Sequence, residues 1–593
     1  MKVSIAQLQK YFDAPLPSAE ELDAVFTFHS FEIDARADDW LDISVLPNRA
    51  ADCLSHRGIA RELSALLSVP VARDPLRTPE PSFPKTSALR VVVEDPKKCL
   101  RYMGALMRGV KVGPSPDWLK EALGAMGQQS INNVVDAANY VMLHIGQPLH
   151  IFDVNKLSRD GDAYKIVVRS AHEGERLTTL SGEELVLSED MLLIADGNSN
   201  TPLALAGVKG GMAALVDETT TDLVIEAASF DGPSVRRAAQ SAKLFTDASL
   251  RFQNEPSSAL AAYGMREVVS LIADIAGGEL EGVTDVYGAR AQASPARVRV
   301  SLEKINGLLG SDFSHEQVQE VFTRLAFSFD EVQGGWEITP PFERTDITIP
   351  EDLVEEVGRI IGYDTISPKI LPEPSTPSDQ AYFRGIERVK DFLLAQGFTE
   401  ISTQTFAKDG DIILANPLDK TKPALRTTLT TNMQDALTRA RRYAPRVLGP
   451  NSAPKLFEIG TIFPGDGERL AVETTEPVSD IPKIIDDGAY VPKHFALGRY
   501  TPFSIYPCML RDIAVWTPEG TKSGEVEALI AASAGALLVR ADLFDSFTKG
   551  TRVSYAFRLV FESPKRTLTD EEIHIFMEKI TKALGARSGY EVR

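Results

Sequence analysis

The pattern of apolar and polar residues near the end of the chain predicts a small domain of strands and helices. Residues 552–561 alternate between the two kinds with period 2, which is typical of a strand with one buried face. Residues 511–516 read as a second strand and residues 526–534 as a helix. Thr569 and Glu572 have the spacing of a capping box, so the final helix begins there. The order strand, helix, strand, strand, helix favours a ferredoxin-like fold.

A second pattern, in residues 344–363, predicts a strand that runs into an amphipathic helix. Apolar residues recur at helical spacing, and a capping box, a proline in the first turn and a terminal glycine mark the two ends. The apolar stripe consists of Ile349, Leu353, Val357 and Ile360, and the end signals are Thr348 with Glu351, Pro350 and Gly362.

Acidic residues gather on the polar side of the same helix. Asp352, Glu355 and Glu356 have the spacing i, i+3, i+4, and Asp346 precedes the helix and can fold back toward them. Oxygen ligands grouped in this way suit a hard cation such as Mg²⁺. Acids near a helix N-terminus also favour the helix dipole, each by roughly 0.3–1 kcal/mol. The spacing alone leaves both interpretations open.

Length, charge and cysteine content narrow the class of protein. A chain of 593 residues implies four or five domains. The polar N-terminus argues against a signal peptide, and we find no apolar run that could span a bilayer. Three widely spaced cysteines indicate a reducing cytosol and no zinc site. A formal net charge of −20 argues against a protein that binds nucleic acid by charge alone.

Proline-rich stretches and changes of pattern divide the chain into domains. We expect an α+β multidomain protein with irregular structure over residues 464–502. The expected boundaries are 1–69 for an N-terminal domain, 70–88 for a linker, 89–290 for a large domain, 296–366 for the small domain with the acidic motif, 367–378 for a second linker, 379–502 for a mixed core and 503–593 for the ferredoxin-like domain.

Several motifs resemble, in the same order, the β subunit of bacterial phenylalanyl-tRNA synthetases. The acidic segment matches a family signature, although Phe342 and Glu343 replace Ser-Trp and Pro350 replaces a Glu. Long motifs in a fixed order are far more specific than one short pattern. The other similar segments are residues 42–63, 133–153, 203–211, 226–230, 245–252, 506–514, 543–545 and 566–572.

The resemblance implies an activity, partners and a cellular location. It implies a phenylalanine–tRNA ligase that works in the cytoplasm as an (αβ)₂ heterotetramer, with ATP as a substrate of the whole enzyme, tRNA(Phe) as partner and no membrane association. The α subunit would carry the aminoacylation site, and the β chain would share a Mg²⁺ through Asp346, Asp352, Glu355 and Glu356. The family's inserted oligonucleotide-binding fold has no room here, because Asp34 is followed closely by Asp42.

The resemblance also implies an editing domain that hydrolyses Tyr-tRNA(Phe). A phenylalanine pocket cannot strongly reject a molecule that merely adds a hydroxyl, so a second site is needed. Glu226 matches the residue that reads the tyrosine hydroxyl, and His150 could orient water or the terminal ribose. Without the resemblance, a structural histidine and an edge charge are the simpler interpretations. Ala138 and Lys209 depart from the family's usual Thr and Met. The matching pocket residues are Asn139, Gly207, Gly210, Thr246 and Ala248.

Two further regions carry predictions. The resemblance implies that residues 379–502 form a shortened, degenerate class II synthetase-like core with an antiparallel sheet. This core lacks a glycine-rich, arginine-bearing strand, so we expect it to be catalytically silent, with Arg426 and Glu458 structural or interfacial. In the last domain Arg511, Arg552, Lys565 and Arg566 are candidates for tRNA backbone contact, although isolated surface cations are usually only solvated. The competing hypothesis is a non-enzymatic scaffold or RNA-binding paralogue.

Overall fold

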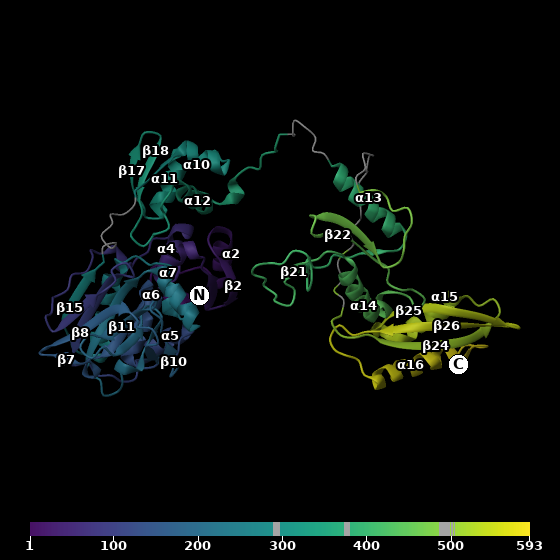
Figure 1. The fold of residues 1–593 in the computed structure, drawn as a ribbon, viewed down its shortest axis with the longest axis horizontal. Coiled ribbons are helices and arrows are strands. Elements are labelled where there is room, and N and C mark those ends of the chain that lie inside the picture. Colours follow the sequence, from purple (N-terminus) through teal and green to yellow (C-terminus); the bar gives the residue numbers. More distant parts are fainter. Residues whose placement is uncertain (289–296, 373–379, 485–498, 500–501, 503) are drawn as a thin grey trace. The chain divides into compact units, whose positions relative to one another are not determined.

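The structure is a computed structural model that describes residues 1–593 except 289–296, 373–379, 485–498, 500–501 and 503. The chain forms two compact units, residues 1–370 and 371–593 (Figure 1). Both units combine helices with sheets, which confirms the predicted α+β multidomain class. Among the described residues, no helix is both long and apolar enough to cross a bilayer.

The N-terminal domain is a three-stranded sheet covered by short helices. Its strands lie in the order β1 (Lys2–Ser4), β3 (Trp40–Ser44) and β2 (Glu32–Ala37). Ala37 pairs with Trp40, so only two residues connect β2 to β3 and no domain is inserted between them, as predicted. The helices are α1 (Ile5–Gln9), α2 (Ala19–His29), α3 (Ala50–Cys53) and α4 (His56–Leu67).

The large domain stacks two sheets and a layer of helices. The first sheet has the order β15 (Glu279–Tyr287), β5 (Cys99–Arg108), β14 (Asp222–Phe230) and β6 (Leu149–Asp153). The second has the order β13 (Lys209–Gly210), β12 (Pro202–Leu205), β11 (Leu192–Asp196), β8 (Ala163–Ser170) and β4 (Leu89–Val93), with β7 (Arg159–Asp160) beside β8. The remaining elements are α5 (Asp117–Ala125), α6 (Asn133–Ile145), β9 (Arg176–Thr178), β10 (Glu184–Val186), α7 (Gly232–Ala242), α8 (Asp247–Phe252) and α9 (Leu260–Ala276).

Alternation along β5 and β14 places two apolar cores on opposite faces of the first sheet. Val224, Ala228 and Phe230 pack toward the second sheet, while Leu223 and Ile225 pack toward α6 and α9. Successive side chains of a strand point to opposite faces, so every even-numbered position of β14 lies between the sheets. Glu226 is therefore directed into an apolar core.

The small domain combines a three-stranded sheet with three helices. Its elements are β16 (Val298–Ser301), α10 (Leu302–Leu309), α11 (His315–Arg324), β17 (Ser328–Val332), β18 (Gly335–Thr339) and α12 (Pro350–Ile361). In α12, Pro350 lies in the first turn and Gly362 ends the helix, as predicted. Leu353, Val357 and Ile360 are buried, but Ile349 is half exposed because it precedes the helix.

The predicted capping box of Thr348 and Glu351 is wrong. Asp352 accepts the backbone N–H groups of Thr348 and Ile349 at 2.7 and 2.9 Å. Glu351 turns outward instead and pairs with Lys304 of α10. The carboxylate of Asp352, one residue after Glu351, thus accepts the unpaired backbone N–H groups at the start of this helix.

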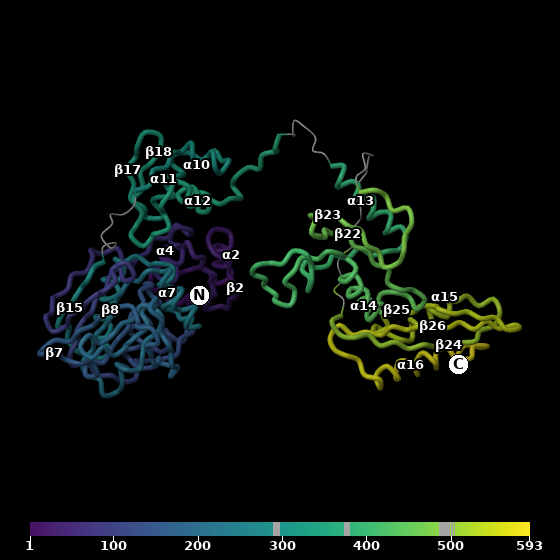
Figure 2. The backbone as a smooth tube through the Cα atoms, in the orientation of Figure 1, coloured from purple at the N-terminus to yellow at the C-terminus, as the bar shows by residue number. Residues whose placement is uncertain are grey.

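The second unit begins with a small α/β core. Helices α13 (Ala381–Ala395) and α14 (Thr430–Val447) accompany the strands β19 (Thr399–Glu400), β22 (Leu456–Ile462) and β23 (Arg469–Thr474), and β20 (Phe406–Ala407) pairs with β21 (Ala424–Leu425). Figure 2 shows β22 beside β23, which lies within the stretch expected to be irregular, so that expectation is wrong for residues 469–474. Much of residues 485–503 lies outside the described part of the chain.

The last domain confirms the ferredoxin-like prediction. Its sheet has the antiparallel order β25 (Leu538–Lys549), β26 (Arg552–Phe561), β24 (Met509–Pro518) and β27 (Glu591–Val592). Helices α15 (Ser523–Ala534) and α16 (Asp570–Gly585) cover one face. Thr569 and Glu572 form the predicted capping box. The short β27, which the sequence did not reveal, completes the sheet.

Candidate functional sites: a buried carboxyl cavity and an acidic helix

Two predicted site residues of the large domain are directly opposite each other in the first sheet. Glu226 of β14 pairs with His150 of β6 across the strands. Opposite residues of an antiparallel pair share a face, so both side chains point into the space between the two sheets. The sequence placed these residues 76 positions apart, and the strand register brings them together.

A small cavity of about 60 Å³ lies beside this pair. It lies where the turn between β12 and β13 and the helix α8 close over the end of the inter-sheet space. Five of the seven residues predicted for the editing site line it, namely His150, Gly207, Gly210, Glu226 and Ala248. The other lining residues are Pro148, Leu149, Ile194, Ala204, Leu205, Val208, Lys209 and Phe252.

Gly210 is required by the packing of His150. A Cβ atom on residue 210 would lie 2.2 Å from Cε1 and 2.8 Å from Nε2 of the imidazole. Gly207 has a φ of +70°, a conformation that favours glycine, and a Cβ there would meet Val235 at 2.9 Å. Both positions thus have no room for a larger side chain.

Glu226 is buried, and no cation among the described residues forms an ion pair with it. The side chain is 5 % exposed, and burial raises the pKa of its carboxyl to about 8. The phenol of Tyr102, on β5, donates a hydrogen bond to Glu226 Oε2 at 3.0 Å, which opposes this rise in pKa. Glu226 is consequently a neutral carboxylic acid in most molecules near pH 7. A strongly shifted carboxyl in a cavity is a candidate functional group.

His150 is neutral at physiological pH. Burial, with a smaller contribution from the charge of Lys209, lowers the pKa of His150 to about 4. Its ring packs edge-on against Phe152 with centroids 4.6 Å apart. The imidazole therefore offers one donor and one acceptor nitrogen to the cavity rather than a positive charge.

The two other predicted pocket residues lie outside the cavity lining. Thr246 caps α8 and donates a hydrogen bond to the backbone oxygen of Val208 at 2.8 Å, so it holds the cavity wall from behind. Asn139 is half-buried on α6, on the opposite side of the first sheet. Ala138, which replaces the family's threonine, is buried in the core beneath that helix. Sequence reasoning missed Tyr102, whose only signal was a phenol within an apolar strand.

The four acids of the predicted magnesium site do not converge in this structure. Glu356 is 3 % exposed and is bonded to Arg344 and Arg359, with an Arg359 Nη2–Oε2 distance of 2.6 Å. Both oxygens of Asp346 accept from Arg344, at 2.9 and 2.7 Å. Glu355 is exposed to solvent.

These arginines belong to a buried ionic network that joins the small domain to the N-terminal domain. Arg359 also binds Glu62 of α4, and Arg49 binds the same glutamate at 2.9 Å. Arg344 and Arg359 hold the pKa of Glu356 well below its usual range despite its burial. Arg359 and Arg49 likewise lower the pKa of Glu62 to about 2. Ion pairs therefore hold α12 both to its own domain, through Arg344, and to the N-terminal domain, through Glu62.

The arrangement does not fit a closed magnesium site within this chain. Across the described residues, no group of three or more metal-binding side chains comes together. Two of the four predicted ligands are neutralised by arginines, and Asp352 caps the helix through Oδ2. Only Glu355 and the other oxygen of Asp352 are uncommitted in the described contacts of this helix.

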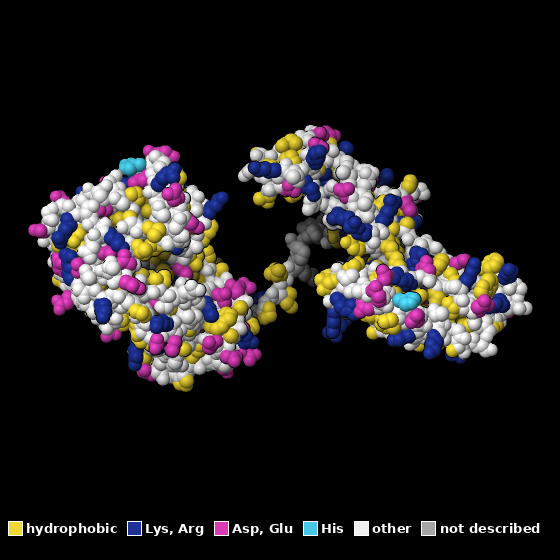
Figure 3. All heavy atoms as spheres, turned by 90° about the horizontal axis from the view of Figure 1, so that it is seen from below, with side chains coloured by type: hydrophobic (Ala, Val, Ile, Leu, Met, Phe, Trp, Pro, Cys, Tyr) yellow, Lys and Arg dark blue, Asp and Glu magenta, His cyan; other side chains and the backbone are white. Residues whose placement is uncertain are grey.

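The predicted tRNA-contacting cations of the last domain are mostly engaged with carboxylates. Arg511 pairs with Asp570, Arg566 pairs with Glu572, and Arg552 pairs with Glu591 at 2.8 Å. Lys565 is exposed. Figure 3 shows acidic and basic side chains interspersed over the visible faces of both units, so no broad single-sign surface stands out in this view.

The charged pair of the mixed core is structural, as expected. Arg426 binds Glu458 at 2.8 Å, and both side chains are buried. Thr403 donates a hydrogen bond to the same carboxylate at 2.7 Å. A buried pair with its hydrogen bonds satisfied fixes the packing of β22 and supplies no free group for chemistry.

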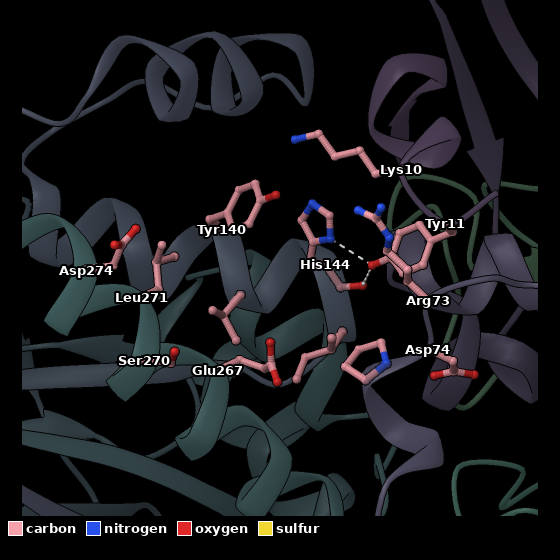
Figure 4. Close-up of a pocket in the computed structure, with 13 residues that line it drawn as sticks. Lys10, Tyr11, Arg73, Asp74, Tyr140, His144, Glu267, Ser270, Leu271 and Asp274 are labelled. Atoms are coloured by element: carbon pink, nitrogen blue, oxygen red, sulfur yellow. Dashed lines mark hydrogen bonds between the residues drawn. The ribbon is translucent and has the colours of Figure 1, made fainter. Parts of the chain in front are cut away.

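A much larger cavity of the first unit, about 710 Å³ in volume, is not a better candidate. It opens between α1, α6 and α9 (Figure 4). Its most buried polar groups satisfy each other, because Tyr11 and His144 Nδ1 are hydrogen-bonded at 2.7 Å. Lys10, Arg73 and Asp274 on its rim are exposed, and Asp74 is already paired with Arg57. Size alone therefore does not mark the functional site.

Comparison with known proteins agrees with this organisation. A family model described as the B3/4 domain matches residues 98–277, one described as the tRNA synthetase B5 domain matches residues 298–363, and one described as the ferredoxin-fold anticodon-binding domain matches residues 504–593. The first contains the cavity, and the second contains the acidic helix.

Relatives match across nearly the whole chain. Phenylalanine–tRNA ligase β subunits from Bacillus cereus and Moorella thermoacetica are 30 % and 31 % identical, each over 98 % of this chain and 84 % of their own length. The one from Anaeromyxobacter dehalogenans is 32 % identical over 93 % of this chain and 80 % of its own. An N-terminal fragment of the Pyrococcus horikoshii β-subunit gives a TM-score of only 0.35 at 16 % identity, over 61 % of this chain and 99 % of the fragment. With such identity to the bacterial chains over this length, the chain belongs to the family of phenylalanine–tRNA ligase β subunits.

Proposed function

We propose that this chain proofreads for a phenylalanine–tRNA ligase, hydrolysing Tyr-tRNA(Phe) at the cavity beside Glu226. The observation that carries the proposal is a buried carboxyl that lines a cavity with a neutral histidine and forms no ion pair with any described residue. Such a carboxyl gains little from the fold itself, because burial opposes its charge. It gains a partner when a ligand brings a hydroxyl group.

The chemistry of the cavity favours tyrosine over phenylalanine. A phenol can donate to, or accept from, the carboxyl of Glu226, whereas the ring C–H of phenylalanine leaves it unpaired in an apolar core. Sites built to bond a hydroxyl discriminate strongly against analogues that lack it. The cavity's volume of about 60 Å³ means that its walls must move apart to admit a tyrosyl side chain.

His150 is placed to act on water rather than as a charged acid. A neutral imidazole accepts a hydrogen bond from a water molecule and so orients the water's oxygen toward the ester carbon of the aminoacyl-tRNA. Gly210 sets the position of the ring, because no side chain at that residue would leave room for it. The leaving group is the ribose hydroxyl of the tRNA, which takes up a proton as the ester bond breaks.

We assign the aminoacylation reaction itself to a partner subunit. We propose an (αβ)₂ assembly in the cytoplasm, in which the α subunit uses ATP to attach phenylalanine to tRNA(Phe). A Mg²⁺ shared with α would meet this chain at Asp352 and Glu355, because arginines hold Asp346 and Glu356. The proposed domain boundaries remain those expected from the sequence.

We propose that tRNA(Phe) contacts the open face of the ferredoxin-like sheet. Trp516 points away from the helices, because its neighbour Val515 is buried beneath them. The Trp516 and Phe547 rings lie edge to face with centroids 6.2 Å apart, and Arg552 lies 5.6 Å over the Trp516 ring. Aromatic rings flanked by cations form stacking surfaces for unpaired bases. Arg511 and Arg566 pair with carboxylates of α16, which covers the other face of the sheet, so Arg552 is the predicted cation nearest this surface. Lys565 remains a candidate for a tRNA backbone contact.

One experiment tests the editing proposal and its alternative. The native chain is purified with any co-purifying subunit and incubated with Tyr-tRNA(Phe) or Phe-tRNA(Phe). We expect an α-type partner and faster hydrolysis of the tyrosyl ester, with the preference reduced at least about 10-fold in Glu226→Ala. A chain that brings no such partner and hydrolyses neither ester would be a non-enzymatic scaffold or RNA-binding paralogue instead.

A further inference from the structure

We propose that Tyr102 is a specificity-determining positioning residue, whose hydroxyl fixes one oxygen of Glu226 so that the other oxygen alone reads a para-hydroxyl group in the cavity. The inference rests on the proposed editing function. It adds a residue that does not line the cavity and that touches neither the ester nor the water, so its effect on specificity passes entirely through Glu226.

The geometry comes from two neighbouring strands. Tyr102 of β5 pairs with Ala228 of β14, which is two residues from Glu226 and on the same face. This diagonal position lets the phenol reach Glu226 Oε2 at 3.0 Å. Tyr102 is fully buried among apolar side chains, so its hydroxyl has no competing water.

The two oxygens of Glu226 are therefore unequal. Oε2 accepts from Tyr102, while no side chain or backbone group of the described residues is hydrogen-bonded to Oε1. Burial also raises the pKa of Tyr102 well above its usual value, so the phenol remains a donor at any pH at which the protein is folded. Because Oε2 already accepts the hydrogen bond of Tyr102, the acid proton of neutral Glu226 belongs on Oε1.

This asymmetry gives the cavity a defined polar contact. Neutral Glu226 donates its Oε1 proton to the oxygen of a tyrosyl hydroxyl, and ionised Glu226 accepts the proton of that hydroxyl at the same oxygen. Without Tyr102 the carboxyl can rotate about its last torsion and present either oxygen. The hydroxyl of Tyr102 also lowers the pKa of Glu226, so its removal raises that pKa further.

The test compares hydrolysis of Tyr-tRNA(Phe) and Phe-tRNA(Phe) by the chain, purified with its partner subunit, across a range of pH. In Tyr102→Phe we expect the tyrosyl preference to fall about 10-fold and its pH dependence to move to higher pH. The matched control is Tyr164→Phe, which removes a phenol from the same core without touching Glu226. It should leave the preference and its pH profile unchanged.

A double-mutant cycle separates this role from a structural one. If Tyr102 acts through Glu226, Tyr102→Phe should have no further effect on the preference in a Glu226→Ala background. An equal loss in both backgrounds, or an unchanged preference and pH profile in Tyr102→Phe, overturns the inference and leaves editing intact. A wild-type complex that shows no tyrosyl preference overturns both the inference and the proposed function.

Discussion

Glu226 and Glu356 are two glutamates buried to nearly the same extent, and their pKa values move in opposite directions. Glu226 is 5 % exposed, forms no ion pair with any described residue, and its pKa rises to about 8. Glu356 is 3 % exposed, touches two arginines, and its pKa falls well below the usual value. Burial alone thus does not distinguish a functional acid from a structural one. The presence or absence of a counter-charge does.

The comparison also separates the two sites that the sequence suggested. The acidic helix attracted attention because its carboxylates were numerous, yet most of them are satisfied within the fold. The cavity beside Glu226 is lined by a single carboxylate, and among the described residues only one of its two oxygens accepts a hydrogen bond. An unsatisfied group at a cavity is the better guide to ligand binding.

The largest effect should follow from breaking the ionic network at Glu356. Glu356→Gln leaves Arg344 and Arg359 buried with less negative charge, and we expect the free energy of unfolding to fall by about 3–5 kcal/mol. Urea unfolding followed by tryptophan fluorescence measures this. Its neighbour Glu355 is exposed, so Glu355→Gln should change stability by no more than about 0.5 kcal/mol. Equal small effects of both substitutions would remove the network from our account.

The next largest effect concerns the preference for the tyrosyl ester, and it should follow from substitution of Glu226 but not of Glu356. Glu226→Ala should reduce the preference for Tyr-tRNA(Phe) over Phe-tRNA(Phe) by about 1.5–3 kcal/mol, because the buried tyrosyl hydroxyl is then left without a hydrogen-bond partner. Glu356→Gln, assayed at a temperature where it is folded, should keep the wild-type ratio. If the two variants lost preference equally, the division between a functional and a structural acid would be wrong.

Sequence reasoning predicted features that depend on neighbours in the chain. The capping box at Thr569, the stop at Gly362 and the direct link from β2 to β3 all follow from local patterns. The sequence also predicted the ferredoxin-like order of strands and helices, and it identified Glu226 and His150 as candidate site residues. The family motifs supplied the roles expected of these two residues, and the structure supplied their juxtaposition.

What the sequence could not reveal depends on contacts between distant segments. Glu356 was expected on the polar side of its helix. It is instead buried, because its partner Arg359 also binds Glu62, which pairs with Arg49, about 300 positions earlier in the chain. Tyr102 stood in an apolar strand with nothing to show that its phenol meets β14. Asp352 replaced Glu351 as the cap because its backbone position, one residue later, faces the free N–H groups.

A smaller effect should come from disturbing the imidazole. Gly210→Ala places a methyl group on the ring of His150, so the ring must move, at a cost of about 1 kcal/mol in stability and with a slower hydrolysis of Tyr-tRNA(Phe). Gly124→Ala in α5 is the control, since nothing lies within 4 Å of the added atom. Hydrolysis by Gly210→Ala at the wild-type rate would show that the position of His150 does not matter.

The smallest effect concerns the charge beside His150. Lys209→Met removes a positive charge that lowers the pKa of His150, so this pKa should rise by less than about one unit. On acidification the histidine would become protonated earlier, and the acid limb of the hydrolysis profile should move to slightly higher pH. A profile that moves to lower pH would contradict the assigned role of Lys209.

The most direct test of the central claim is the pH dependence of stability in wild type and Glu226→Gln. The raised pKa of Glu226 means that between about pH 4.5 and 8 the folded state retains a proton that the unfolded state has lost, so wild-type stability falls as pH rises through this range. Glutamine has no such proton. From pH 6 to 8, the unfolding free energy of Glu226→Gln should therefore gain about 2 kcal/mol relative to wild type. A difference that stays constant over this range would mean that Glu226 is ionised and paired as Glu356 is, and would contradict the account.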